Sequence, residues 1–159
     1  MATPVISNLL VEEPLPELMA ITIQRELAER IVAGPGSKNY GALSIWIQSQ
    51  CDVELVRVMP PTVFFPRPKV ESAIVQIRLA RDKRSRLGDV AFFHSFVRSM
   101  FFHRRKFLRS ELLAAFKGQL DKPQVDAILA DLGHGTDRRA EQLDVERMIE
   151  LCHRVKADL

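Results

Sequence analysis

The segment TVFFPRPKVESAIVQIRL, residues 62–79, joins an aromatic, proline-rich stretch directly to an alternating pattern. Every second residue from Ala73 to Leu79 is apolar, which is the period of a strand with one buried face. The β-branched stretch DVELVRVM, residues 52–59, predicts a second strand before it. These two patterns predict neighbouring antiparallel strands.

The connection between the two strands is not an ordinary hairpin turn. Pro61, Pro66 and Pro68 hold the chain extended and keep the preceding residues out of helical conformations. No Asn-Gly or Asp-Gly pair is present for a two-residue turn. The sequence therefore predicts a stiff loop that presents its aromatic side chains on a shaped surface.

The first 80 residues have the order of an α/β domain. LMAITIQ (18–24) predicts a buried strand, RELAERIVA (25–33) a helix, and YGALSIWIQSQ (40–50) a second helix. This order indicates a parallel sheet that ends in an antiparallel pair. Three strands are few for such a domain, so we expect further strands upstream. In their absence we expect an unpaired edge, self-association, or marginal stability in residues 1–76.

The second half changes to a helical period. Apolar residues from 92 to 116 follow amphipathic helix spacing, and the stretches 123–133 and 145–157 predict two further helices, the last capped by Asp144. The predicted fold class is α/β plus all-α. The predicted domains are residues 1–80, a basic linker at residues 81–88, and a helical domain at residues 89–159.

Composition excludes several classes of protein. The 159 residues contain no apolar run of the roughly 20 residues that a membrane span needs. The two cysteines are far apart in sequence, which indicates reduced thiols and a cytoplasmic protein, and the four scattered histidines predict no metal site. Residues 78–109 hold 10 Lys and Arg against 2 Asp and Glu. Such a block favours a polyanionic partner, with a solvated linker as the alternative.

Five ordered segments resemble the C-terminal part of one enzyme family, the ribosomal RNA adenine N6,N6-dimethyltransferases, or dimethyladenosine transferases. They are ATPVISNLL (2–10), IQRELAERIVAGPGSKNYGALSI (23–45), FFPRPKVESAIVQI (64–77), HRRKFLRSELL (103–113) and GTDRRAEQLDVERMIEL (135–151). The resemblance implies the C-terminal remnant of a Rossmann-like methyltransferase domain followed by a small helical RNA-binding domain. It also implies methyl transfer from S-adenosylmethionine to two adjacent adenosines near the 3' end of small-subunit rRNA.

The family's cofactor and catalytic motifs are missing from this sequence. It contains no Gly-rich GxGxG turn and no Asn-Leu-Pro-Tyr segment, and ATPVISNLL resembles what directly follows the latter. The resemblance therefore implies no catalytic and no cofactor-binding residue in this chain. We expect that the chain alone neither binds S-adenosylmethionine nor methylates RNA, whereas full-length members do both.

The resemblance also implies a substrate-binding site on the proline-rich loop, and the basic residues further along the chain predict a second one. The ring that matches Phe64 stacks on the adenine that is swung out of the RNA, as chemistry on a base requires. Phe65 and Arg67 depart from the family pattern, which leaves open whether Phe64 or Phe65 faces the base. Arg67 and Lys69 would contact phosphate or be solvated. The alternative is that both rings lie in the core under the loop.

The second site is the basic segment HRRKFLRS. Arg104, Arg105, Lys106 and Arg109 span less than two helical turns and are expected to bind the RNA backbone. The alternatives are a solvated face or ion pairs with acidic residues of the last helices. TDRRAEQLDV (136–145) is interpreted as a packing element.

Three hypotheses for function follow from these residues. The chain is part of an rRNA adenine dimethyltransferase, a non-catalytic RNA- or ribosome-binding protein derived from that family, or a basic helical DNA-binding module. The third leaves the proline-rich aromatic loop unexplained.

Overall fold

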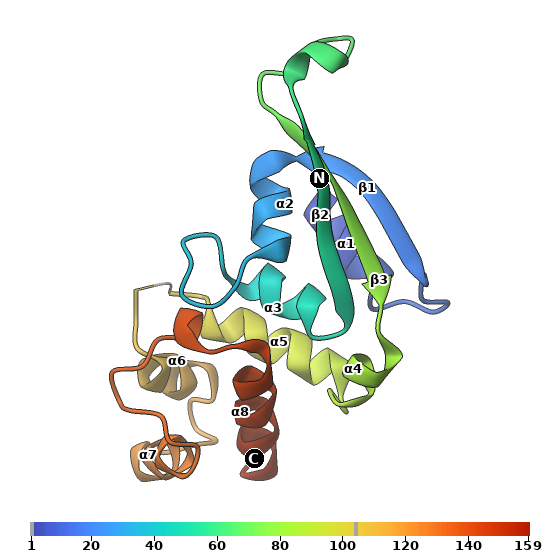
Figure 1. The fold of residues 1–159 in the computed structure, drawn as a ribbon. Coiled ribbons are helices and arrows are strands. Elements are labelled where there is room, and N and C mark those ends of the chain that lie inside the picture. Colours follow the sequence, from blue (N-terminus) through green and yellow to red (C-terminus); the bar gives the residue numbers. More distant parts are fainter. Residues whose placement is uncertain (1, 104) are drawn as a thin grey trace.

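The sheet of this protein has three strands in the order β1–β3–β2 (Figure 1). The computed structural model describes residues 2–103 and 105–159. β1 (Leu18–Gln24) and β2 (Cys51–Met59) each pair antiparallel with β3 (Ser72–Leu79). The expected antiparallel pair is therefore confirmed as β2–β3.

The sheet differs from the expected parallel sheet in its strand order and in the direction of its strand pairs. β1 and β2 run in the same direction, but β3 lies between them, so the described strands contain no parallel pair. The physical reason is the burial of β3. Its residues Ala73, Val75 and Ile77 are at most 1% exposed, and the central position gives this most apolar strand two neighbours.

Helices cover one face of the sheet. α2 (Arg25–Val32) and α3 (Ala42–Gln48) pack on the strands, and α1 (Ala2–Leu9) packs against α3. Met19 and Ile23 of β1 are buried toward this layer, whereas Ala20 and Thr22 of the same strand are exposed. One face of the sheet thus carries the core of the first half of the chain.

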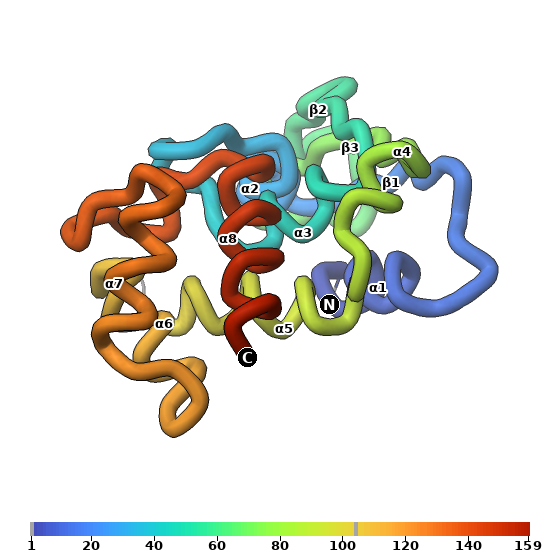
Figure 2. Tube along the Cα trace, turned by 90° about the horizontal axis from the view of Figure 1, so that it is seen from below, coloured from blue at the N-terminus to red at the C-terminus, as the bar shows by residue number. Residues whose placement is uncertain are grey.

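Four helices form most of the second half: α5 (Val90–Met100), α6 (Leu108–Ala115), α7 (Lys122–Asp131) and α8 (Val145–Ala157). In Figure 2, α6 and α7 lie at one end of the molecule, and α5 runs from them toward α1. The expected cap is present, because the Asp144 carboxylate accepts from the Arg147 backbone amide at 2.8 Å. The helical pattern of residues 92–116 is interrupted, since α5 ends at Met100 and a turn precedes α6.

The expected basic linker contains a short packed helix, α4 (Arg81–Ser85). Arg84 donates to the backbone carbonyl of Leu10 at 2.8 Å and to the side-chain oxygen of Gln50. Leu87, just after the helix, is buried. The connection between the two halves is thus held against the first half, and the division into two domains remains a prediction.

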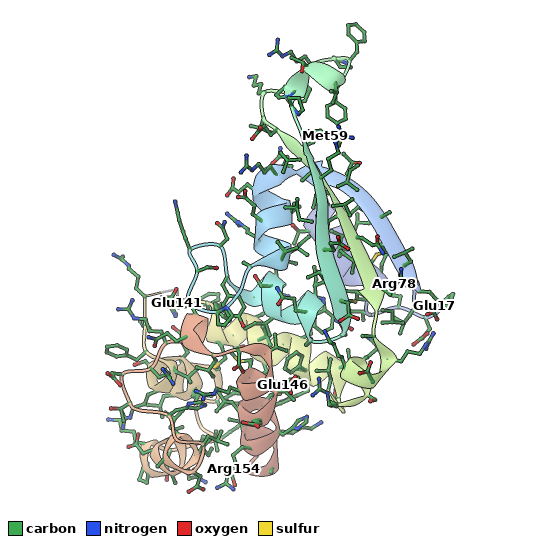
Figure 3. All side chains as sticks on the ribbon, in the orientation of Figure 1. Glu17, Met59, Arg78, Glu141, Glu146 and Arg154 are labelled. Carbon is green, nitrogen blue, oxygen red and sulfur yellow. The ribbon has the colours of Figure 1, made fainter. Side chains whose placement is uncertain are left out.

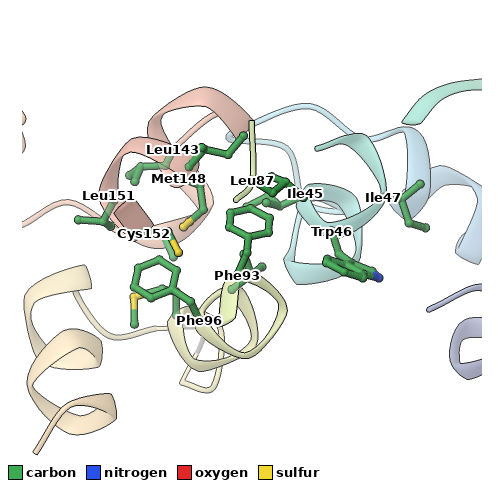
Figure 4. Packing of buried hydrophobic residues seen from close by; sticks show 14 of the residues in the cluster. Ile45, Trp46, Ile47, Leu87, Phe93, Phe96, Leu143, Met148, Leu151 and Cys152 are labelled. Carbon is green, nitrogen blue, oxygen red and sulfur yellow. The ribbon is translucent and has the colours of Figure 1, made fainter. Parts of the chain in front are cut away.

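One hydrophobic core continues through both halves. Figure 4 shows Ile45 and Trp46 of α3 beside Phe93 of α5, with Met148 and Leu143 on the other side. All five residues belong to the same cluster of buried residues. The two halves are therefore packed together through α3, α5 and α8.

The segment from residue 135 to residue 144, here called the bridging segment, adds hydrogen bonds between the halves. The Gly36 amide donates to the carbonyl of Glu141 at 2.8 Å, and the Tyr40 hydroxyl donates to the carbonyl of Leu143 at 2.8 Å. The bridging segment contains the short 3-10 helix η2 (Ala140–Gln142). The loop between α2 and α3 is thus fastened to the helical half.

Both cysteines lie in the core as free thiols. Burial raises the pKa of Cys51 and of Cys152 to about 12, which keeps both thiols neutral. Over residues 2–103 and 105–159, no helix combines the length and apolar character that crossing a membrane requires.

Candidate functional site

The first candidate surface is the loop between β2 and β3, residues 60–71, here called the aromatic loop. It begins with the 3-10 helix η1 (Pro61–Val63), and in Figure 3 it projects beyond Met59 at the end of β2. Phe65 is fully exposed, whereas Phe64 is only partly exposed. Neither ring belongs to the core or to the residues packed against it. The loop therefore presents Phe65 to solvent as a free aromatic face.

The basic residues of the aromatic loop are also accessible. Arg67 and Lys69 are both exposed, and neither forms an ion pair with a carboxylate in the described part of the chain. Their charges are thus available on the same loop as Phe65.

A hollow lies at the foot of the aromatic loop, between β1, α2 and β3. Its walls include Gln24, Pro61 and Lys69. Arg25 spans the hollow and donates to Glu29 at 2.8 Å and to Glu71 at 2.7 Å. The pKa of Arg25 is raised, most of all by its hydrogen bond to Glu29 and next by its hydrogen bond to Glu71. The Arg25–Glu71 pair joins the start of α2 to the residue before β3, whereas the Arg25–Glu29 pair lies within α2. Sequence reasoning did not anticipate the first pair because Arg25 and Glu71 are far apart in the chain.

The second candidate surface is the connection between α5 and α6, residues 101–107, here called the basic loop. Arg105 and Lys106 are exposed on it, and Arg104 lies outside the described residues. Phe102 is 79% exposed and Phe107 44% exposed. In the sequence of the basic loop, a run of cations is flanked by phenylalanines, a composition typical of single-stranded nucleic-acid contacts.

Arg109, expected in the same site, is instead engaged within the protein. Its guanidinium forms a two-point contact with Asp126 of α7, in which Nη2 lies 2.9 Å from Oδ2. The pair raises the pKa of Arg109 and lowers that of Asp126. Arg109 thus shows the ion pair with an acidic helix that was the alternative to RNA contact.

The basic block of residues 78–109 is partly neutralised by local pairs around α4. Lys83 contacts Asp52 at 2.6 Å, Arg86 contacts Glu146 at 2.8 Å, and Arg81 contacts Glu17. Glu17 and Glu146 are labelled in Figure 3 on either side of this region. The free positive charge is therefore concentrated on the basic loop more than on the expected linker.

The bridging segment borders the basic loop. The Leu108 amide donates to the carbonyl of Arg138 at 2.7 Å, and the Arg139 guanidinium lies 5.7 Å from the centroid of the Phe107 ring. The segment is a packing element, as expected, but it also adds Arg139 to the edge of the basic loop. Sequence reasoning missed this placement, because 32 positions separate Phe107 from Arg139.

The two surfaces lie at different levels of the molecule. In Figure 1 the aromatic loop is at the top, and the basic loop follows α5 beside the loop that joins α2 to α3. Phe101 and Asn39 line a common hollow there. A ligand that contacts both surfaces must extend along the α2 side of the molecule.

The described residues do not fit a methyl-donor cofactor or a metal. β1, β2 and β3 are followed by Arg25, Pro60 and Ala80, so no strand leads into a glycine turn whose amides could approach a phosphate or carboxylate. Within residues 2–103 and 105–159, no group of three or more His, Cys, Asp or Glu side chains could hold a metal ion. The two surfaces offer exposed aromatic rings and exposed cations.

Comparison with known proteins identifies the group to which these features belong. Residues 1–151 match the model of the family described as ribosomal RNA adenine dimethylase. The chain is 39% identical over 151 residues to the ribosomal RNA small subunit methyltransferase A of Halothermothrix orenii, covering 95% of this chain and 50% of that protein. It is 37% identical over 154 residues to the protein of that name from Lactobacillus johnsonii, covering 97% and 51%. The chain thus spans about half the length of these relatives.

Solved structures agree with the fold. A dimethyladenosine transferase from Plasmodium falciparum superposes with a TM-score of 0.86 at 23% identity, over 99% of this chain and 63% of that chain. The 23S rRNA methyltransferase ErmE superposes with a TM-score of 0.63 at 22% identity, over 97% and 61%. At these identities the likeness concerns the arrangement of helices and strands.

Proposed function

Because this chain belongs to the ribosomal RNA adenine dimethylase family, we propose that it supplies the target-base loop and the RNA-binding helices of an rRNA adenine N6,N6-dimethyltransferase. The proposed substrate is small-subunit rRNA in the cytoplasm, at two adjacent adenosines near its 3' end. S-adenosylmethionine would be held by the half of the relatives' length that this chain does not span. The chain alone is proposed to be inactive.

The exposed ring of Phe65 is the observation that carries this proposal. An adenine must leave its stack before its N6 can be methylated, which costs a few kcal/mol, and an aromatic face returns about 1–3 kcal/mol per base. Phe65 is fully exposed at the tip of a loop stiffened by prolines, whereas Phe64 is partly buried. We therefore assign the stacking role to Phe65 and the support of the loop to Phe64. Arg67 and Lys69 would bind the phosphates that flank the extruded base.

The basic loop is proposed to bind the RNA backbone. Arg105 and Lys106 are exposed and unpaired in the described part of the chain, and Arg139 adds a further guanidinium at the edge. Arg104 belongs to the same proposed site by its sequence. Arg109 is assigned to the α6–α7 contact, since its guanidinium is already bound by Asp126.

A binding experiment with a labelled rRNA hairpin tests the two surfaces separately. The hairpin contains the adjacent adenosines, one of them replaced by 2-aminopurine, whose fluorescence reports stacking. Anisotropy measures overall affinity. We expect Phe65→Ala to change the 2-aminopurine signal with little effect on affinity, and Arg105→Ala with Lys106→Ala to reduce affinity. Methylation is then measured in a form that also contains the upstream half.

The outcomes separate the competing functions. RNA binding together with methylation in the extended form supports the dimethyltransferase. RNA binding without methylation in that form favours a non-catalytic RNA- or ribosome-binding protein. Equal or tighter binding to duplex DNA of the same charge would favour the DNA-binding module and overturn the proposal.

A further inference from the structure

A buried carboxylate lies directly beneath the basic loop. The side chain of Glu111, in the first half of α6, is 2% exposed, and Nδ1 of His103 lies 3.3 Å from one of its oxygens and 3.4 Å from the other. His103 belongs to the basic loop, and its own side chain is 45% exposed. The pair thus links the interior of the helical half to the loop surface.

Burial of this carboxylate is unfavourable for stability by itself. A desolvated carboxylate costs several kcal/mol unless charge and hydrogen bonds compensate for it, and an apolar side chain in its place is often neutral or stabilising. The N-terminal end of α6 provides some compensation. A buried Glu at this position therefore calls for a role other than stability.

The basic loop contains a turn of its own and is tied to the bridging segment at its C-terminal end. His103 begins the turn, in which the Lys106 amide donates to the His103 carbonyl at 2.9 Å. Just after the loop, the Leu108 amide donates to the carbonyl of Arg138 at 2.7 Å. Glu111 contacts the first residue of the turn at residues 103–106 through the His103 ring. Arg105 lies within this turn and Lys106 closes it.

We propose that Glu111 is a positioning residue for RNA binding, which fixes the basic loop through His103 in the conformation that presents Arg105 and Lys106 to phosphate. The inference rests on the proposed function of the basic loop. Preorganisation lowers the ordering cost of binding, so loss of the anchor weakens RNA binding even though Glu111 touches no RNA.

The sign of the effect makes the proposal testable. Removal of a negative charge near a polyanion strengthens attraction by simple electrostatics. Removal of a carboxylate that positions the basic loop should instead weaken RNA binding. We expect Glu111→Gln to weaken binding of the hairpin by roughly five- to tenfold, because the amide keeps an acceptor for the His103 ring but loses the additional strength that charge gives a hydrogen bond. The matched control Glu150→Gln removes an exposed carboxylate from α8 and should leave affinity unchanged or slightly higher.

Stability provides a second, independent readout. Glu111→Leu removes the buried charge and leaves only the half-exposed His103, so the melting temperature should stay the same or rise while RNA affinity falls. Hydrogen exchange of residues 101–107 should accelerate in Glu111→Gln without a change in α8. His103→Asn should weaken binding similarly, and the double variant His103→Asn with Glu111→Gln should be no weaker than either single variant.

The results distinguish this proposal from the one on which it rests. If Arg105→Ala with Lys106→Ala leaves RNA affinity unchanged, the RNA-binding role of the basic loop is wrong. If that variant is weakened but Glu111→Gln binds as tightly as the parent or more tightly, only the positioning role is wrong. A parallel loss of melting temperature and affinity in both Glu111 variants would show Glu111 to be a structural residue and would also overturn the proposal.

Discussion

Arg109 and Asp126 hold α6 against α7 through a two-point contact between guanidinium and carboxylate. The two side chains are 30% and 43% exposed, so water screens the pair, and its effect on stability is modest. This contact explains why Arg109 is not available on the basic loop, although it belongs to the same basic motif as Arg105 and Lys106.

The acid dependence of stability should reveal this pair. Arg109 lowers the pKa of Asp126 below its ordinary value of 3.8, so the stabilisation is present above that value and is lost as pH falls through the lowered pKa. Asp126→Asn should therefore melt below the parent at pH 7 and approach it under acid conditions. Thermal melts from pH 7 to pH 2 measure the difference, and a constant gap over that range would contradict the assignment.

Substitutions of Arg109 should separate stability from RNA binding. Because its guanidinium is engaged by Asp126, Arg109→Ala should lower the melting temperature as Asp126→Ala does, with RNA affinity within about twofold of the parent. Anisotropy with the rRNA hairpin checks the second value. A decrease in affinity equal to that of Arg105→Ala would show that Arg109 contributes to RNA binding after all.

Salt dependence should count the phosphates bound by the basic loop. The double variant Arg105→Ala with Lys106→Ala should weaken binding and reduce the slope of log K against log salt by about 0.7–0.9 for each phosphate that the variant no longer binds. The control Lys117→Ala with Lys122→Ala removes the same charge beside the connection between α6 and α7. Equal slopes for the two double variants would indicate a general charge effect.

The aromatic loop should affect methylation more than binding. In a form that contains the upstream half, Phe65→Ala should reduce methylation strongly, since stacking is gained mainly after the base is extruded. Phe65→Tyr and Phe65→Trp should retain more activity than Phe65→Leu, which lacks a π face. The same series at Phe64 is the control. If Phe64→Leu is inactive while Phe65→Leu is active, the stacking ring is Phe64.

The edge of β1 should drive self-association of the isolated chain. Among the described strands β1 pairs only with β3, and its exposed residues Leu18, Ala20 and Thr22 carry no charge. The β2 edge is protected by charged residues and by the irregularity between Leu55 and Arg57. Analytical ultracentrifugation should show concentration-dependent dimers that Thr22→Lys suppresses and Val56→Lys does not. A monomer at all concentrations would contradict this prediction.

Calorimetry should detect no binding of S-adenosylmethionine by the chain alone, because its strands lead into no glycine turn. A full-length relative serves as the positive control. Measurable binding by this chain would show that the cofactor site does not need the upstream half.

Local signals in the sequence were sufficient for much of the fold. The period of residues 72–79 and the Asp144 cap depend on neighbouring residues, and both were predicted correctly. The order of strands was not, because β1 and β3 pair across about 50 intervening residues. α4 was missed for a similar reason: Arg84 is held by Leu10, which lies 74 positions away.

The candidate site was predictable in composition but not in exposure. Two adjacent phenylalanines, Phe64 and Phe65, have the same propensity, and only the course of the loop decides which ring faces water. Ion pairing was an alternative for all four basic residues of the motif, but nothing in the motif singled out Arg109 or indicated Asp126 as its partner. Both outcomes depend on packing between segments that are remote in the chain.

The shared core and the bridging segment have a consequence for the shape of any RNA that binds at the two proposed surfaces. Since Tyr40 and Leu143 are joined across the two halves, the spacing between the aromatic loop and the basic loop is set before RNA arrives. An RNA engages both at once only if its own folding holds an adenosine and a remote stretch of backbone at that spacing. A folded hairpin that contacts both loops then binds more tightly than either contact alone would allow, because the second contact forms at high effective concentration. The same nucleotides in a denatured strand lack this gain in affinity.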